Sequence, residues 1–110
     1  MALARLRAHL RGLLGLVPTL DLHGLGVRDA VVETERFLCQ ARAEGVDSVR
    51  IVYGKGHRSP GGRGVLREVI PRWLDEHGAG LVLRYERRPD ETGVDGALVV
   101  WLRPESTVQS

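Results

Sequence analysis

The sequence predicts an α/β fold: a two-layer sandwich with a mixed four-stranded sheet, in the order βαβαββ after a leading N-terminal helix. Short runs rich in β-branched residues alternate with segments of helical periodicity, and the last two β-like runs are separated only by a turn-rich stretch. Alternation with helices favours parallel pairing of the early strands, and a closing hairpin adds antiparallel pairing. At 110 residues and 43% hydrophobic content, the chain suits one domain with one modest core.

The N-terminal segment 1–17 has the pattern of an amphipathic helix. Apolar residues recur at spacings of three and four with arginines between them, at Leu3, Leu6, Leu10, Leu13 or Leu14, and Val17. Pro18 marks the expected end of this helix. The helix can pack on the domain's own surface or dock on a partner such as a ribosome or a membrane surface, and the pattern leaves both open. We predict an N-terminal extension over 1–18, a domain over 19–104 and a C-terminal tail over 105–110.

The first three elements of the domain are a strand, a helix and a second strand. Apolar and polar residues alternate over 20–23, and Gly24 ends this predicted strand. Helical periodicity follows over 27–41, and Gly45 is the expected C-terminal cap. The β-rich run 49–53 predicts a strand that feeds a glycine-rich loop.

The remaining elements are a helix and two strands. Apolar spacing predicts an amphipathic helix over 65–78, although Pro71 lies inside the pattern and predicts a kink or a restart. Two β-like runs follow, over 81–85 and 97–102. The stretch between them is polar and contains Pro89, Gly93 and Gly96. These two runs form the expected hairpin.

Composition excludes several classes of protein. Cys39 is the only cysteine, which excludes an internal disulfide, a CxxC redox pair and a cysteine-rich zinc site, and favours a cytoplasmic location. No stretch approaches the roughly 18 apolar residues needed to cross a bilayer, so we expect no membrane span. With 16 basic and 14 acidic residues, any case for polyanion binding depends on where the charges lie. We expect a monomer.

Asp21 and His23 lie at the end of the first predicted strand. Alternation along a strand places both on one side, and Leu20 and Leu22 on the other. A carboxylate beside an imidazole suits general acid–base catalysis, in which the carboxylate orients the ring, and it suits a metal site equally well. The same spacing occurs in capped turns and exposed ion pairs, so it does not separate a catalytic role from a structural one.

The second predicted strand leads into the glycine-rich loop GKGHRSPGGRG, residues 54–64. Its glycines let backbone N–H groups approach an anion closely, and Lys55 and His57 add a cation and a second imidazole. Between 50 and 72 only Glu68 is acidic, whereas six residues are basic: Arg50, Lys55, Arg58, Arg63, Arg67 and Arg72. This cluster favours phosphate contact, although solvated arginines around a flexible loop would give the same pattern.

The loop matches neither common nucleotide-binding pattern. A Walker A sequence needs glycine where Val49 stands and Ser or Thr where Gly56 stands, and GxGxxG is also missing. These departures argue against ATPase and dinucleotide-binding functions. Lys55 is the only lysine in the chain, which favours a specific use for its compact ammonium charge.

Five short motifs, taken in order, resemble the Smr (small MutS-related) domain family in its standalone bacterial type. They are LDLHG at 20–24, GKG at 54–56, GVLR at 64–67, PRWL at 71–74 and GALVVWLR at 96–103. The resemblance implies a compact α/β sandwich similar to the C-terminal domain of a translation factor. It also implies the DNA-nicking or RNA endonuclease activity that several members have.

Two motifs of the family match this sequence position by position. Its LDxH motif falls on Leu20–His23, and its glycine loop falls on Gly54, Lys55 and Gly56. Tyr53 stands where many members have His or Thr, a departure that alters the substrate contact implied at that position. Gly26 stands where a Ser or Thr helix cap is common, a change that costs only a few tenths of a kcal/mol.

These observations predict a nucleic-acid-binding domain with endonuclease activity. In this hypothesis His23 is the acid or base, Asp21 fixes its ring, Lys55 and loop amides stabilise the charged phosphorane, and His57 is a second acid–base group. The predicted phosphate-binding residues are Gly54, Lys55, Gly56, Arg58, Arg63 and Arg67. On RNA the 2′-hydroxyl can be the nucleophile. If Asp21 and His23 instead hold Mg²⁺ or Mn²⁺, water is the nucleophile and DNA is an equally good substrate.

Two other functions fit the sequence. The first is a non-catalytic module that binds nucleic acid or the ribosome, in which Asp21 and His23 are structural and the basic residues contact phosphates. The second is a protein-interaction domain that uses the N-terminal helix. Substitution of His23 separates the enzyme from the binding module, because a pure binder has no turnover to lose.

Overall fold

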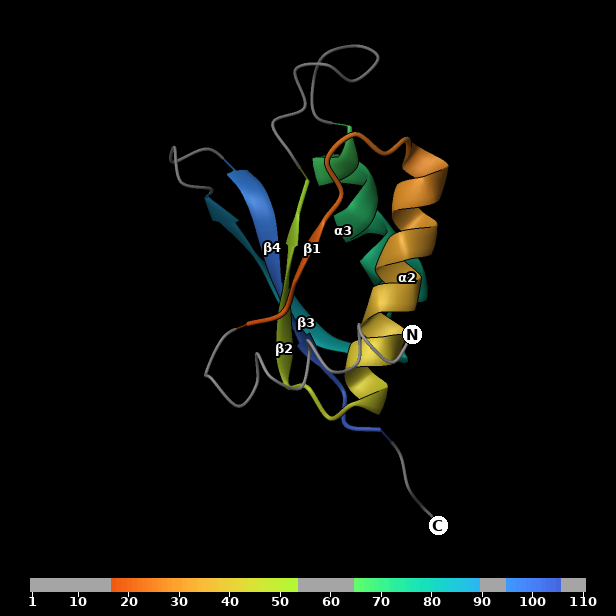
Figure 1. Ribbon diagram of the computed structural model, residues 1–110, viewed down its shortest axis with the longest axis vertical. Helices are drawn as coiled ribbons and strands as arrows, with labels where there is room; N and C mark the ends of the chain where they lie inside the picture. The colour runs from red at the N-terminus through yellow and green to blue at the C-terminus, as the bar shows by residue number, and fades with distance from the viewer. Residues whose placement is uncertain (1–16, 54–64, 90–94, 106–110) are drawn as a thin grey trace.

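The computed structural model describes residues 17–53, 65–89 and 95–105, and in this part of the chain the elements follow the predicted order (Figure 1). The strands are β1 (Thr19–Asp21), β2 (Ser48–Val52), β3 (Val82–Pro89) and β4 (Asp95–Leu102). The helices are α2 (Val27–Ala43) and α3 (Leu66–His77). The predicted order βαβαββ is therefore confirmed for the domain.

The four strands form one mixed sheet in the order β1-β2-β4-β3. β1 and β2 are parallel, whereas β4 is antiparallel to both β2 and β3. The helix between β1 and β2 explains the parallel pair, and the direct connection from β3 to β4 explains the hairpin. Because β4 lies between β2 and β3, these two strands run in the same direction, and β1, β2 and β3 all end at one edge of the sheet.

Both helices cover the same face of the sheet (Figure 1). Side chains of alternate strand positions point into this layer and are fully buried, including Leu22, Ile51 and Leu98. They meet Leu38 of α2 and Ile70 of α3, which are also fully buried. This single layer is the hydrophobic core, and the described part of the chain places no helix on the other face.

Helix α2 begins and ends as the sequence predicts. Gly26 is its N-cap and supplies no side-chain hydrogen bond. At the other end Gly45 has φ +78°, a left-handed conformation that favours glycine. Its N–H donates to the Arg42 carbonyl at 3.0 Å, which closes the last turn.

Helix α3 corrects the expected restart at Pro71. The helix is continuous from Leu66 to His77 with the proline inside it. Proline has no N–H, so the Arg67 carbonyl one turn earlier loses its usual helical donor. Arg87 of β3 donates from Nη1 to this carbonyl at 3.1 Å, so the strand supplies the missing hydrogen bond.

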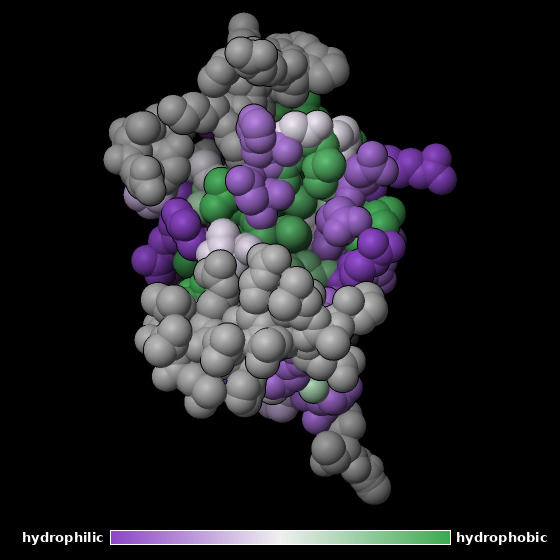
Figure 2. Space-filling model, viewed as in Figure 1, coloured by the Kyte–Doolittle hydropathy of each residue, from purple (hydrophilic) through white to green (hydrophobic). Residues whose placement is uncertain are grey.

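Strand β3 is longer than the predicted run 81–85, because it continues through Arg87 and Arg88 to Pro89. It is an edge strand, and its charged side chains lie at the surface. Polar residues on such a strand resemble a loop in sequence. On the side of the molecule seen in Figure 2, hydrophobic residues gather near the middle of the described surface, and hydrophilic residues lie around them.

Several predictions fall outside the described residues. They are the helix over 1–17, of which only Val17 is described, the loop over 54–64 and most of the tail over 105–110. The domain boundaries therefore stay predictions. In the described ranges no helix is long and apolar enough to cross a membrane.

Candidate functional site

Asp21 lies at the sheet edge where β1 and β2 end. It pairs in register with Val52, and the next residue, Leu22, donates its N–H to the Val52 carbonyl at 2.8 Å. The chain leaves β2 through Tyr53 and enters the glycine-rich segment at Gly54. Parallel pairing therefore brings the LDLHG motif beside the strand that leads into GKG.

Asp21 and His23 form an exposed turn. The carboxylate Oδ1 of Asp21 accepts the backbone N–H of His23 at 2.9 Å, and both side chains are exposed. Leu22 between them is fully buried, so the predicted alternation is confirmed. Gly24 follows with φ +83° and reverses the chain.

The Asp21 carboxylate contacts the backbone of this turn. No hydrogen bond or ion pair joins its carboxylate to the His23 imidazole in the described part of the structure; the carboxylate holds the backbone instead. Such an Asx turn fixes where the next side chains project. The Asp21 carboxylate therefore stabilises the backbone of the turn from which the His23 side chain projects.

Six predicted site residues lie outside the described residues: Gly54, Lys55, Gly56, His57, Arg58 and Arg63. Their roles stay predictions. Arg67 is described, half-buried in the first turn of α3. The described residues contain no group of three or more His, Cys, Asp or Glu that could hold a metal ion.

Arg87 and Arg88 are basic residues at this edge that sequence analysis missed. They lie near the end of β3, which is parallel to β1 and β2, and Arg87 contacts the first turn of α3 through the Arg67 carbonyl. Arg88 lies in the same row across the sheet as Asp21, through Val52 and Ala97. Pro71 inside the helical pattern was the one sequence signal for the position of Arg87. A proline there leaves the Arg67 carbonyl without its helical N–H donor, so a donor from another element is expected.

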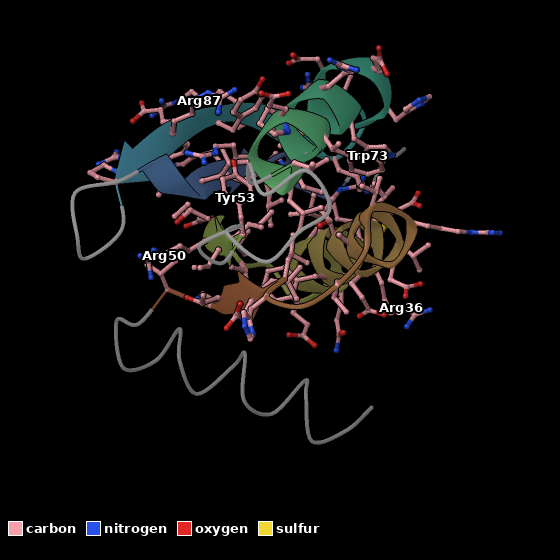
Figure 3. The ribbon with its side chains drawn as sticks, turned by 90° about the horizontal axis from the view of Figure 1, so that it is seen from above. Arg36, Arg50, Tyr53, Trp73 and Arg87 are labelled. Carbon is pink, nitrogen blue, oxygen red and sulfur yellow. The ribbon has the colours of Figure 1, made fainter. Side chains whose placement is uncertain are left out.

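Tyr53, the residue before GKG, is buried. Its side chain is 4% exposed and belongs to the core cluster. Figure 3 shows it between the strands and the helices. The departure from the family's usual His or Thr therefore adds a side chain to the core at the end of β2.

The fold and this edge define a two-layer α/β domain with a polar turn at the carboxyl ends of its parallel strands. The family model described as the Smr domain matches residues 20–103, and the chain belongs to this family. The resemblance found in the sequence is thereby confirmed.

Three relatives illustrate the match. The Smr domain of Thermus thermophilus MutS2, a crystal structure, is 35% identical with a TM-score of 0.66, and the alignment covers 80% of this chain and 100% of that one. Endonuclease MutS2 of Pediococcus pentosaceus is 35% identical over 86 residues, which are 78% of this chain and 10% of that protein. Ribosome rescue factor SmrB of Escherichia coli is 33% identical over 94 residues, covering 80% of this chain and 47% of that protein. The chain thus spans less than half the length of these two full-length relatives.

Proposed function

We propose that this chain binds nucleic acid at the edge where β1 and β2 end and cleaves it there as an endonuclease. The observation that carries this proposal is the exposed turn of Asp21 and His23 next to Val52, two residues before the glycine-rich segment begins. One relative is named an endonuclease, which supports the choice of chemistry. Another is named a ribosome rescue factor, which supports the ribosome or its RNA as a partner.

Each residue has a distinct part in the proposed reaction. The exposed imidazole of His23 transfers a proton, and the turn made by Asp21 fixes its direction. Lys55 and loop N–H groups stabilise the charge that develops on the phosphorane, and His57 is the second acid–base group. On RNA the 2′-hydroxyl is the nucleophile, and the 5′-oxygen of the next nucleotide leaves. If Asp21 and His23 instead held Mg²⁺ or Mn²⁺, the ion would supply Lewis-acid activation of water, and DNA would be an equally good substrate.

A non-catalytic module that binds nucleic acid or the ribosome is the second candidate. The observation in its favour is that Asp21 already has a structural task, since its carboxylate accepts the His23 N–H. In this function the arginines of the sheet edge contact phosphates, and His23 is a surface residue of the turn.

Cleavage of labelled single- and double-stranded RNA and DNA, with Mg²⁺, Mn²⁺ or a chelator, separates the two functions. We expect His23→Ala to lower the cleavage rate by about 10²–10⁴-fold with little change in affinity, because acid–base catalysis contributes that much. The matched control is His77→Ala, an exposed histidine at the far end of α3, which should cleave normally. Cleavage that survives in His23→Ala excludes the proposed mechanism.

Two substitutions of Asp21 test its positioning role. Asp21→Asn keeps an oxygen that can accept the His23 N–H, whereas Asp21→Ala removes it. If Asp21 acts through the turn, Asn retains most of the rate and Ala loses it; if its charge is needed, both lose it. Asp47→Asn, an exposed residue before β2, is the control. Absence of cleavage in every condition, with binding that weakens in salt, favours the binding module.

A further inference from the structure

The sheet face turned away from α2 and α3 carries an arrangement that the cleavage site does not use. On the central strands its side chains alternate with the buried Ile51 and Leu98, and they include Arg50, Val52, Val99 and Trp101. All four are half-buried. We call this surface the open face.

Arg50 is a cation near the middle of the open face, and no described residue gives it an anionic partner. It lies on the inner strand β2, between Thr19 of β1 and Val99 of β4. Among the described residues its guanidinium has no hydrogen bond and no ion pair, and Figure 3 shows it on the side of the sheet opposite the helices. A half-buried guanidinium with five unused donors matches the oxygens of a phosphate.

The carboxylates near Arg50 already have other partners. Asp21 accepts the His23 N–H, and Glu86 pairs with both Arg84 and Arg88 on β3. Two arginines share one glutamate there, so the described side chains of β3 also leave a positive excess. The charge of the open face is therefore complementary to a polyanion.

The open face also has a surface on which a base can stack. The guanidinium of Arg84 lies 3.8 Å from the ring centroid of Trp101, in the strand next to β3. Stacked planes of arginine and aromatic rings bind unpaired bases, whose faces are hidden within a duplex. This feature favours single-stranded over double-stranded nucleic acid.

The open face is continuous with the cleavage site. Arg50 pairs with Thr19, and Asp21 follows two residues later on the same side of β1. From strand spacing and rise, the Cα atoms of Arg50 and Asp21 lie roughly 8 Å apart. One strand of nucleic acid can therefore touch both.

We propose that the open face guides single-stranded nucleic acid to the cleavage site, with a phosphate bound by Arg50 and a base packed on the Arg84–Trp101 pair. This inference rests on the proposed function, which makes nucleic acid the substrate. It adds a binding surface distinct from the glycine-rich loop.

Binding of fluorescently labelled 12-nucleotide oligo(dT) and oligo(U) tests the proposal, in chelator and in the His23→Ala background so that nothing is cut. We expect Arg50→Gln to weaken binding about 3–10-fold and to reduce the salt slope by about one, as loss of one phosphate contact does. Arg36→Gln removes the same charge from the outer surface of α2 and should change affinity less than about 2-fold. Arg50→Lys keeps the positive charge and should bind more tightly than Arg50→Gln, and an unchanged circular dichroism spectrum of Arg50→Gln excludes misfolding as the cause. Equal affinity of Arg50→Gln and Arg36→Gln overturns the proposal.

Trp101 reports on the same surface directly. With Trp73→Phe it is the only tryptophan, and saturating oligonucleotide should change its emission. Unchanged emission places the strand elsewhere and overturns the proposal. The proposal also falls if Arg50→Gln alters thermal stability but not affinity, as expected if residues 1–17 covered this face.

The two proposals fail in different ways. If the protein never cleaves but Arg50→Gln weakens binding, the open face stands and the endonuclease proposal falls. If cleavage depends on His23 but Arg50→Gln binds like Arg36→Gln, the endonuclease stands and the open face is not the path of the strand.

Discussion

On the face of the sheet covered by α2 and α3, Ile51, Leu98 and Val100 are fully buried, whereas the next positions of the same strands, Arg50 and Val99, are half-exposed on the open face. One pair of strands thus presents two different surfaces, because side chains alternate along each strand. The covered face holds the fold together. The open face and its edge carry the charges, the turn of Asp21 and the proposed path of the substrate.

This division makes stability and function separable by substitution. Side chains of the covered face contact only protein, so their loss should act on unfolding. Arg50, Val99 and Trp101 of the open face are partly exposed to solvent, so their loss should act on binding. A substitution that behaved otherwise would show that the two faces are coupled.

The largest expected effect is on the covered face. Leu98→Ala leaves a cavity in the core and should lower the free energy of unfolding by about 2–5 kcal/mol. Val99→Ala, the next residue on the open face, should lower it by about 1 kcal/mol or less. Denaturant unfolding of both variants measures the difference. Similar losses would contradict the division between the two faces.

A smaller effect on the free energy of unfolding, in this case an increase, is expected at Thr34. It is the buried polar residue among those described, and its hydroxyl has no hydrogen-bond partner. Thr34→Val replaces that hydroxyl by a methyl group of similar shape and should raise the free energy of unfolding by about 1 kcal/mol. Thr34→Ser, which keeps the hydroxyl and removes the methyl, should lower it. A destabilised Thr34→Val would show that the hydroxyl has a partner after all.

The fold was predictable from the sequence because local patterns determine most of it. Alternating β-rich and helical segments gave the order of elements, and Gly45 marked the end of α2. The position of β4 between β2 and β3 was not predictable, since it depends on which strands meet after the chain has folded. The end of β3 was missed for a related reason, because arginines on an edge strand have no apolar alternation to reveal them.

The candidate site was predictable only in part. The LDLHG motif identified Asp21 and His23, and their shared side of the strand is confirmed by the burial of Leu22 between them. The bond from the His23 N–H to Asp21 was one of several options that the spacing allowed. The residues next to Arg87 in the sequence do not reveal its contact. Arg87 binds the Arg67 carbonyl, which lacks a helical donor because of Pro71, and Pro71 lies 16 residues before Arg87 in the chain.

The smallest expected effect is on the melting temperature, comes from Glu86 on the open face, and depends on pH. Hydrogen bonds from Arg84, then the charges of Arg84 and Arg88, hold the pKa of Glu86 below its ordinary value of 4.5. The ionised carboxylate therefore favours the folded state above pH 4.5, and this contribution is lost as the pH falls through the lowered pKa. Because Glu86 lies at the surface, Glu86→Gln should lower the melting temperature at pH 7 by no more than about 2 °C.

Thermal unfolding of wild type and Glu86→Gln from pH 7 to pH 3 measures this dependence. The difference in melting temperature should shrink in acid, because protonated Glu86 and Gln are both neutral. Glu76→Gln, an exposed glutamate of α3, controls for the general loss of one negative charge. A difference for Glu86→Gln that persists unchanged at pH 3 would mean that shape rather than charge holds the Arg84–Glu86–Arg88 group. In that case the open face would contribute to the fold in the way that the covered face does.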